Sequence, residues 1–400
     1  MTLKIRSQLS AMMFLEYFVW GCWYVTMSTY LGQTLGFSGV QIGLAYSTFA
    51  ISAMISPFFV GLIADRYFAT ERVLGVLHLV GAILLFGISK AQTFGSFYTL
   101  ILLYNLCYTP TIALSNSLSF NQMSDPGVQF PSIRVLGTIG WIIAGLTIGF
   151  LAIEASASFF AIASASSLVL GLYCFSLPHM PPKKGKKSLG IGEILGLDAL
   201  NLFKQRDFAV LITSSVLISI PLMFYYSFTN LFFNETGMEN AAGKMTMGQM
   251  SEIIFLLIMP FFFKRLGVKK MILIGVLAWV FRYLLFASGN NDQLVWMFYL
   301  GIILHGICYD FFFVTGQIFV DRRAPAHQRS SAQGIITFAT YGLGFFIGTL
   351  VSGQVVDYYA VDDGLHNWKG VWMVPAIFAL LVMIIFGLLF RERKSQAAET

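Results

Sequence analysis

Five charged residues lie well inside apolar stretches of the sequence and are the first candidates for chemistry: Glu16, Arg134, Glu252, Arg282 and Asp310. A charge at the middle of a bilayer costs about 2.5–3.5 kcal/mol on insertion scales, so such residues usually pair or face a polar cavity. The set contains both bases and acids, so these residues are candidates both for pairing with one another and for lining a polar cavity. The aromatic and aliphatic neighbours of Arg282 favour a packing role, with Asp310 as a reasonable partner.

Three residues near position 134 combine charge, a hydroxyl and an aromatic ring. Arg134, Thr138 and Trp141 are spaced i, i+4, i+7 and share one face of a helix. A guanidinium, a hydroxyl and an indole on one face can bind, orient and stack a planar polar ligand. These residues are predicted to bind substrate.

A second polar set lies further along the chain. Gln249 and Glu252 share a helix face at i, i+3, and an amide with a carboxylate can read ribose hydroxyls or the edge of a base. His305 and Tyr309 align on a later stretch, with Asp310 one step around the helix. By contrast, His78 is interpreted as a histidine that packs between helices.

The elements that must position these side chains are membrane-spanning helices. The chain has 400 residues, of which 57% are hydrophobic and 11% charged, whereas about 25% of residues are charged in soluble proteins. The apolar runs are long and continuous, which excludes the alternating pattern of a β-barrel. About 20 apolar residues cross a bilayer, and twelve such spans are predicted: 8–33, 39–63, 72–90, 95–118, 134–154, 156–177, 208–233, 247–264, 270–289, 294–320, 331–356 and 370–390.

A basic polar segment divides the spans into two groups of six. It covers residues 178–206 and contains a run of four lysines between Lys183 and Lys187. The predicted organisation is an N-terminal six-helix bundle (1–177), this cytoplasmic linker, and a C-terminal six-helix bundle (207–400). Basic residues gather at the termini and at alternate loops, which places both termini in the cytoplasm. The net charge of +6 therefore reflects topology, and nucleic-acid binding is not expected.

Other motifs narrow the class of protein. The four cysteines lie in apolar stretches without disulfide or metal spacing, so neither a disulfide nor a metal site is expected. No GxxxxGK[ST] loop is present, so nucleotide hydrolysis does not supply energy. Gly137, Gly140 and Gly145 recur at helix-packing spacing and are predicted to form a contact face.

The loop after the second span reads Gly61-Leu-Ile-Ala-Asp65-Arg66, followed by Arg72. It resembles the signature loop between helices two and three of the major facilitator superfamily. The glycine permits close helix approach, and the Asp–Arg pair can latch neighbouring helix ends on the cytoplasmic face. The resemblance implies an all-α membrane fold with two six-helix bundles.

Over nearly its whole length the chain is similar to bacterial nucleoside:proton symporters of that superfamily. The stretches that carry the resemblance include Phe130-Pro131-Ser-Ile-Arg134-Val-Leu-Gly137-Thr138 and Gln249-Met-Ser251-Glu252. The resemblance implies a central nucleoside site lined by the residues that match its motif: Arg134, Thr138, Trp141, Gln249, Glu252 and Tyr309. Where a relative offers amides in the seventh span, this chain has Met223 and Tyr226, and His305 stands where the family shows a tyrosine.

These observations predict a proton-coupled nucleoside symporter in the bacterial inner membrane, with no cofactor other than the proton and as a monomer. Tyr226 and His305 are expected to join the site from the C-terminal half. A buried carboxylate can exchange a proton as access alternates, and Glu252, then Asp310, then Glu16 are the candidates. The alternatives are a symporter of a sugar or another small polar solute and, outside transport, a membrane receptor or a polytopic enzyme.

Overall fold

The computed structural model describes residues 1–59, 67–182, 197–325, 328–361 and 364–391. Within these ranges the chain is helical, and strand pairing is limited to one isolated bridge between Ala360 and His366. Nine helical stretches of this described part are long and apolar enough to cross a membrane. The prediction of an all-α protein with many apolar spans is therefore confirmed.

The chain divides into two compact units. Unit 1 contains Met1–Ser188, Tyr226–Asn234 and Met238–Thr246, whereas unit 2 contains Leu189–Tyr225, Glu235–Gly237 and Met247–Thr400. The end of one long helix and the beginning of the next therefore belong to unit 1. The predicted division at residues 178–206 stays a prediction, because residues 183–196, including the lysine run, lie outside the described residues.

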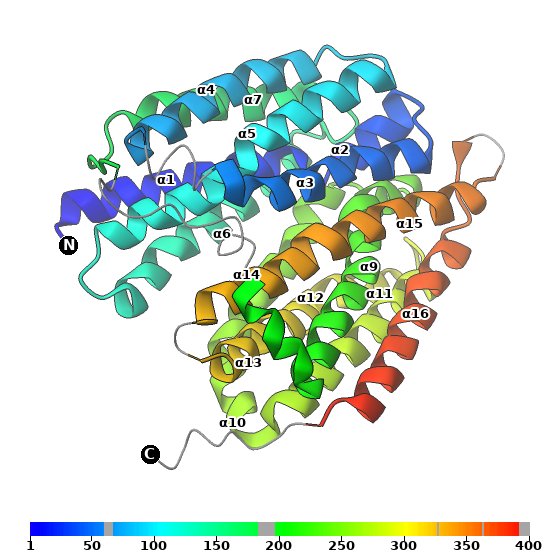
Figure 1. The fold of residues 1–400 in the computed structure, drawn as a ribbon. Helices are drawn as coiled ribbons and strands as arrows, with labels where there is room; N and C mark the ends of the chain where they lie inside the picture. Colours follow the sequence, from blue (N-terminus) through cyan, green and yellow to red (C-terminus); the bar gives the residue numbers. More distant parts are fainter. Residues whose placement is uncertain (60–66, 183–196, 326–327, 362–363, 392–400) are drawn as a thin grey trace. The chain divides into compact units, whose positions relative to one another are not determined.

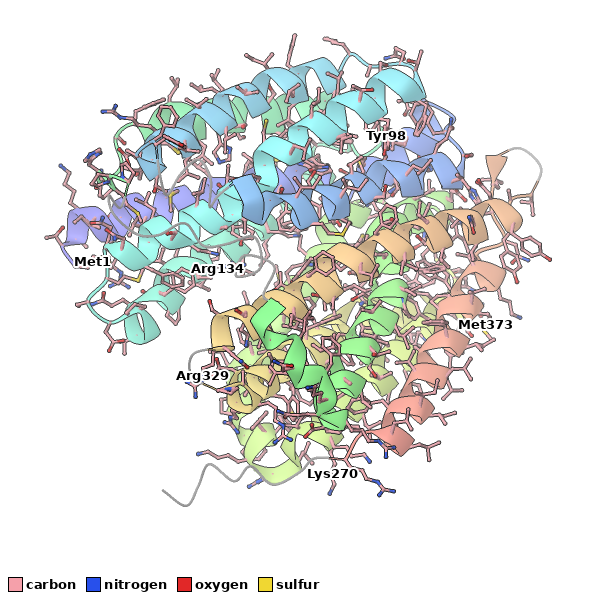
Figure 2. All side chains as sticks on the ribbon, viewed as in Figure 1. Met1, Tyr98, Arg134, Lys270, Arg329 and Met373 are labelled. Carbon is pink, nitrogen blue, oxygen red and sulfur yellow. The ribbon has the colours of Figure 1, made fainter. Side chains whose placement is uncertain are left out.

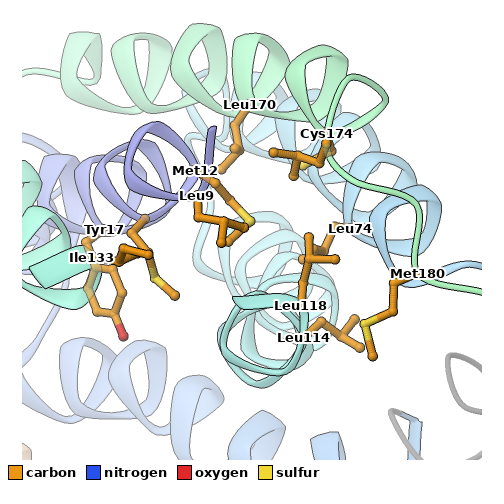
Figure 3. Close-up of a cluster of buried hydrophobic side chains, with 12 residues drawn as sticks. Leu9, Met12, Tyr17, Leu74, Leu114, Leu118, Ile133, Leu170, Cys174 and Met180 are labelled. Carbon is orange, nitrogen blue, oxygen red and sulfur yellow. The ribbon is translucent and has the colours of Figure 1, made fainter. Parts of the chain in front are cut away.

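Unit 1 is built mainly from the first half of the chain (Figure 1). Its helices are α1 (Leu3–Trp23), α2 (Met27–Thr29), the π-helical η1 (Tyr30–Thr34), α3 (Gly39–Phe59), α4 (Thr70–Ile88), α5 (Phe94–Asn121), α6 (Pro126–Phe150) and α7 (Ser158–Cys174). α1 packs against α6 and α7, and α4 packs against α5 and α7. A cluster of buried apolar side chains, drawn in Figure 3, fills the space between these helices and includes Leu9, Met12, Leu74, Leu114, Leu118 and Leu170.

Two long helices follow: α9 (Arg206–Glu235) and α10 (Ala241–Ser288). The remaining elements of unit 2 are η3 (Leu197–Lys204), α11 (Val295–Ile303), α12 (His305–Tyr309), the π-helical η4 (Asp310–Val314), α13 (Thr315–Arg323), α14 (Arg329–Thr337), the π-helical η6 (Phe338–Gly344), α15 (Phe345–Tyr358) and α16 (Trp368–Leu389). Two predicted spans of unit 2 are therefore interrupted helices, with π-helical turns at Asp310–Val314 and Phe338–Gly344.

The predicted loop between the eighth and ninth spans is a break inside α10. Gly267 has φ 68° and ψ 176°, a conformation that glycine adopts without the steric cost of a Cβ. Lys270, labelled in Figure 2, follows three residues later. The two predicted spans are thus two helical segments within α10 that meet and change direction at Gly267.

The start of α6 differs from the prediction, which places the beginning of this span at Arg134. The helix begins at Pro126, and the Asp125 side chain caps it by accepting a hydrogen bond from the backbone N–H of Val128. Aspartate at the cap followed by proline is a favourable helix start. Arg134 therefore lies in the third turn of α6 rather than at its end.

α1 and α6 approach each other closely at a glycine. A Cβ atom at Gly140 would lie 2.2 Å from the carbonyl oxygen of Phe14, and one at Gly137 would lie 2.7 Å from the Tyr17 ring. Both distances are shorter than a van der Waals contact. The predicted glycine face of this span is therefore confirmed as a contact between helices.

Gly140→Ala is expected to lower the melting temperature of the purified protein, because the added methyl group forces α1 and α6 apart. Overpacking of this kind costs about 1–3 kcal/mol. The matched control is Gly95→Ala, since no atom lies within 4 Å of a Cβ at Gly95. Equal melting temperatures for the two variants in detergent would contradict the close packing described.

Candidate functional site

The polar face predicted around Arg134 lies on α6 in unit 1 (Figure 2). Arg134, Thr138 and Trp141 are all half-buried. A half-buried side chain has both a fixed packing contact and a surface that a ligand can reach. The three residues therefore form a candidate binding face within unit 1.

Arg134 is held by an aromatic ring. Its guanidinium carbon lies 4.1 Å from the centroid of the Tyr17 ring, which is a cation–π contact. Among the described residues no carboxylate forms an ion pair with Arg134. The ring stabilises the charge without accepting conventional hydrogen bonds from the guanidinium N–H groups, which can therefore serve a ligand.

Aromatic rings continue this face. The Trp141 ring meets Trp20 edge-on at 5.0 Å, and Trp20 stacks on Phe49 at 4.9 Å. Tyr24 lies 6.1 Å from Trp141 and 6.0 Å from Tyr226. The sequence prediction assigns Tyr226 to the C-terminal half, whereas this end of α9 packs in unit 1, so Tyr226 belongs with Trp141 and its neighbours.

The second predicted set lies in unit 2. Gln249 and Glu252 are half-buried on α10, and the Glu252 side chain is 28% exposed. His305 is fully buried, and its Nε2 lies 3.9 Å from Glu252 Oε2. Tyr309 is half-buried and forms a hydrogen bond with the hydroxyl of Tyr341. The predicted carboxylate and imidazole are therefore neighbours, whereas Gln249 and Tyr309 lie on the same two helices, α10 and α12.

Arg282 and Asp310 do not pair, so that prediction is wrong. Arg282 is fully buried, and its Nη1 lies 3.1 Å from Nδ1 of His305. Its guanidinium also stacks on the Tyr225 ring at 3.4 Å. Both carboxylate oxygens of Asp310 are buried, and neither has a hydrogen-bond partner in the described part of the chain. A buried carboxylate in that situation is a candidate for carrying a proton.

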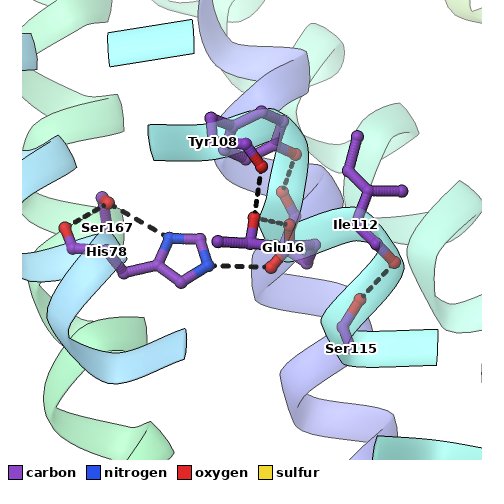
Figure 4. Close-up of polar contacts among 7 residues, drawn as sticks. Glu16, His78, Tyr108, Ile112, Ser115 and Ser167 are labelled. Atoms are coloured by element: carbon purple, nitrogen blue, oxygen red, sulfur yellow. Dashed lines mark hydrogen bonds and ion pairs between the residues drawn. The ribbon is translucent and has the colours of Figure 1, made fainter. Parts of the chain in front are cut away.

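Glu16 belongs to a closed hydrogen-bond network in unit 1 (Figure 4). Its Oε2 lies 2.9 Å from Nε2 of His78, and its Oε1 accepts a hydrogen bond of 2.6 Å from Thr111. The Ser167 hydroxyl donates to the His78 carbonyl at 2.8 Å. The interpretation of His78 as a packing histidine agrees with this arrangement, and the structure adds Glu16 as its partner.

A second network in unit 1 is centred on Glu154, a residue that the hydropathy and charge pattern do not single out. The Glu154 carboxylate accepts hydrogen bonds from Asn230 at 2.7 Å and Asn234 at 2.9 Å. It also accepts from the backbone N–H of Ala242, at 3.0 Å, in the first turn of α10. An anion there is favoured by the helix dipole. The i, i+4 spacing of the two asparagines was the available sequence signal.

The remaining predicted residues concern the signature loop. Gly61, Asp65 and Arg66 lie outside the described residues, so their predicted latch is untested. Arg72 is exposed in the first turn of α4. Over the described ranges, no group of three or more His, Cys, Asp or Glu side chains could hold a metal ion.

The chain is similar to known proteins over almost its whole length. A model of the nucleoside H+ symporter family matches residues 1–395. In Escherichia coli (strain K12), YegT is 42% identical over 408 aligned residues, covering 98% of this chain and 96% of YegT. Xanthosine permease is 34% identical, covering 96% and 95%, and nucleoside permease NupG is 32% identical, covering 98% and 97%.

The structure is also similar to a solved one. The crystal structure of the nucleoside transporter NupG matches with a TM-score of 0.91 at 32% identity, covering 98% of this chain and 100% of the NupG chain. NupG has the major facilitator fold. These relatives are transporters, which confirms the prediction of a transporter rather than an enzyme.

The Glu16–His78 pair is expected to stabilise unit 1. Glu16→Ala and His78→Ala should each lower the melting temperature, because each leaves a buried polar partner behind. In a double-mutant cycle the losses should fall short of additive by about 0.5–3 kcal/mol. Thr99→Ala is the control, since Thr99 is exposed and its hydroxyl donates to the carbonyl of Gly95 in its own helix. Strictly additive losses would contradict the pairing.

Proposed function

This chain belongs to the nucleoside H+ symporter family, and we propose that it takes up nucleosides together with protons across the bacterial inner membrane. The observation that carries the proposal is the Arg134 face on α6. A half-buried guanidinium that is stabilised by the Tyr17 ring, without a carboxylate partner among the described residues, lies on one helix face with Thr138 and Trp141. A nucleoside offers the matching groups, namely a planar base and several hydrogen-bond acceptors.

Each side chain has a distinct role in the proposal. Arg134 and Thr138 donate hydrogen bonds, while Trp141 and Tyr226 provide aromatic surface for the base. Gln249 and Glu252 read hydroxyl groups or the edge of the base, and Tyr309 adds a further ring and hydroxyl. His305 is fully buried, so it contributes through its neighbour Glu252.

The proposed topology has twelve spans in two bundles, with the linker at 178–206 and both termini in the cytoplasm. Nine apolar stretches are supported by length and composition. Counting α1 and α7, and treating α10 as two spans that meet at Gly267, gives twelve. A helix of 48 residues would extend about 72 Å, more than twice the hydrocarbon thickness of about 30 Å.

Alternating access by rocking of the bundles, in a monomer, completes the proposed mechanism. The proton is the coupling ion. Glu252 is the first candidate to carry it, because its side chain is both partly exposed and close to buried polar groups. Asp310 is second, as a buried carboxylate, and Glu16 is third, since His78 and Thr111 already bind its oxygens.

The first experiment is uptake of radiolabelled nucleosides into proteoliposomes with and without an inward proton gradient. Gradient-stimulated uptake is expected, and Arg134→Met should weaken it about tenfold or more through loss of charged hydrogen bonds. Lys90→Met is the matched control, because Lys90 is an exposed cation that lies 5.6 Å from the centroid of the Phe86 ring. Competition by sugars that lack a base, with no effect of any nucleoside, would instead support a sugar symporter.

Glu252→Gln is expected to abolish uphill accumulation while leaving nucleoside exchange across the membrane, because an amide cannot release a proton. The measurement pairs gradient-driven uptake with counterflow in the same vesicles. Glu239→Gln, an exposed replacement of the same kind, is the control. Undiminished uphill uptake by the Glu252 variant would remove Glu252 from the coupling mechanism.

A further inference from the structure

Arg282 is a permanent charge enclosed in unit 2. The residue is 0% exposed, and its guanidinium is surrounded by the rings of Tyr225, Trp279 and Phe286 at 3.4, 5.5 and 5.8 Å. Such a cage stabilises a cation by cation–π contacts. A buried arginine still costs desolvation energy, and its hydrogen bond to His305 offsets part of that cost.

The hydrogen bond between Arg282 and His305 determines the protonation state and the tautomer of the imidazole. A guanidinium has N–H donors and no acceptor, so Nδ1 of His305 must accept the bond of 3.1 Å from Nη1. A doubly protonated imidazolium has no acceptor to offer. The imidazole is therefore neutral, and its remaining proton lies on Nε2.

This assigned N–H group lies beside Glu252. Nε2 of His305 is 3.9 Å from Oε2 of Glu252, a separation that a small rotation of the carboxylate shortens to a hydrogen bond. Glu252 is 28% exposed whereas the His305 side chain is 0% exposed. The imidazole is thus enclosed, whereas part of the Glu252 side chain is accessible from outside unit 2.

Close packing holds the two side chains at this distance. A Cβ at Gly306 would lie 2.6 Å from the carbonyl oxygen of Ser251, and one at Gly248 would lie 3.2 Å from Cβ of His305. The Ser251 hydroxyl also donates to the carbonyl of Ile303 at 2.5 Å. The segment of α10 that carries Glu252 is therefore fixed against the start of α12, which carries His305.

We propose that Arg282 and His305 are positioning residues for Glu252. Arg282 sets the His305 tautomer, and His305 donates from Nε2 to the ionised Glu252 carboxylate, turning one oxygen inward and leaving the other for substrate. This rests on the proposed function. Among the described residues, Asp310 on η4 and Tyr225 on α9 are further titratable groups that interact with Glu252.

Two substitutions of His305 separate its two bonds. In His305→Asn the side-chain oxygen can replace Nδ1 as the acceptor for Arg282, but the side chain is too short to reach Glu252. In His305→Gln the amide N–H₂ reaches about as far as Nε2 and can still donate. Uptake by the Asn variant should show about a tenfold higher half-saturation concentration, the size expected of a lost hydrogen bond to a charged group, and a pH midpoint moved toward alkaline values.

The direction of the pH change follows from the bond itself. A donor to the charged form of a carboxylate favours that form, so Glu252 takes up its proton at a higher pH once the donor is lost. The Gln variant should stay closer to wild type than the Asn variant in both readouts. Equal behaviour of the two variants overturns the proposal, because general disruption of packing affects both.

A double substitution tests the role of Arg282. Arg282→Met should shift the pH midpoint in the wild-type background, since the imidazole is then free to change tautomer, and Arg282→Lys, which keeps a donor, should shift it less. In His305→Gln the amide nitrogen carries its hydrogens whether or not Arg282 is present. Adding Arg282→Met to His305→Gln should therefore produce little further shift, and equal shifts in both backgrounds overturn the tautomer assignment.

Separate control experiments test whether each variant folds and whether the wild-type protein takes up nucleosides as proposed. Melting temperature and gel filtration in detergent identify unfolded variants, and if Arg282→Met does not fold, the comparison of His305→Asn with His305→Gln decides. A wild-type protein that neither binds nor takes up radiolabelled nucleosides disproves the proposed function and this inference with it. Gradient-driven uptake by wild type, with unchanged pH midpoints in all folded variants, overturns the inference alone.

Discussion

The cost of burying charge among apolar helices is the constraint on which the rest of the structure depends. Glu16 and Arg282 are both 0% exposed, and an isolated charge in such a place would cost several kcal/mol. Each is therefore matched by groups on other segments. Glu16 on α1 binds His78 on α4 and Thr111 on α5, while Arg282 stacks on Tyr225 of α9 and binds His305 of α12. Satisfying these charges fixes how the helices of each unit pack.

Glycines bring two further pairs of polar or aromatic side chains together, because a residue without a side chain lets the helices approach closely. The contact of Gly140 with Phe14 brings α6 against α1, and the contact of Gly306 with Ser251 brings α12 against α10. The first places Arg134 over the Tyr17 ring, and the second places His305 beside Glu252. Electrostatic and steric requirements are thus met at the same helix crossings.

The sequence predicts well those features that depend on a single helix. Hydropathy predicts the apolar stretches, and the i, i+4, i+7 spacing places Arg134 and Trp141 on one helix face. The sequence does not predict contacts that depend on how two helices rotate toward one another. The sequence suggests Asp310 as a reasonable partner of Arg282, yet nothing in a linear pattern shows that His305 faces the guanidinium. Chain order assigns Tyr226 to the C-terminal half, whereas α9 contributes that end to unit 1. Asp125 followed by Pro126 is a favourable helix start, and the structure shows that it caps α6.

The two arginines show how one side chain serves different ends. Arg282 has its charge enclosed by rings and its hydrogen bond committed to His305, so it acts within the protein. Arg134 has its charge stabilised by Tyr17 while it is half-buried. A nucleoside is uncharged and cannot neutralise a cation, but it has acceptors for N–H donors. An aromatic ring suits this task better than a carboxylate, because it stabilises the guanidinium through its face and does not compete strongly for those donors. In the proposed function, the cation–π contact therefore lets a permanent charge bind a neutral ligand.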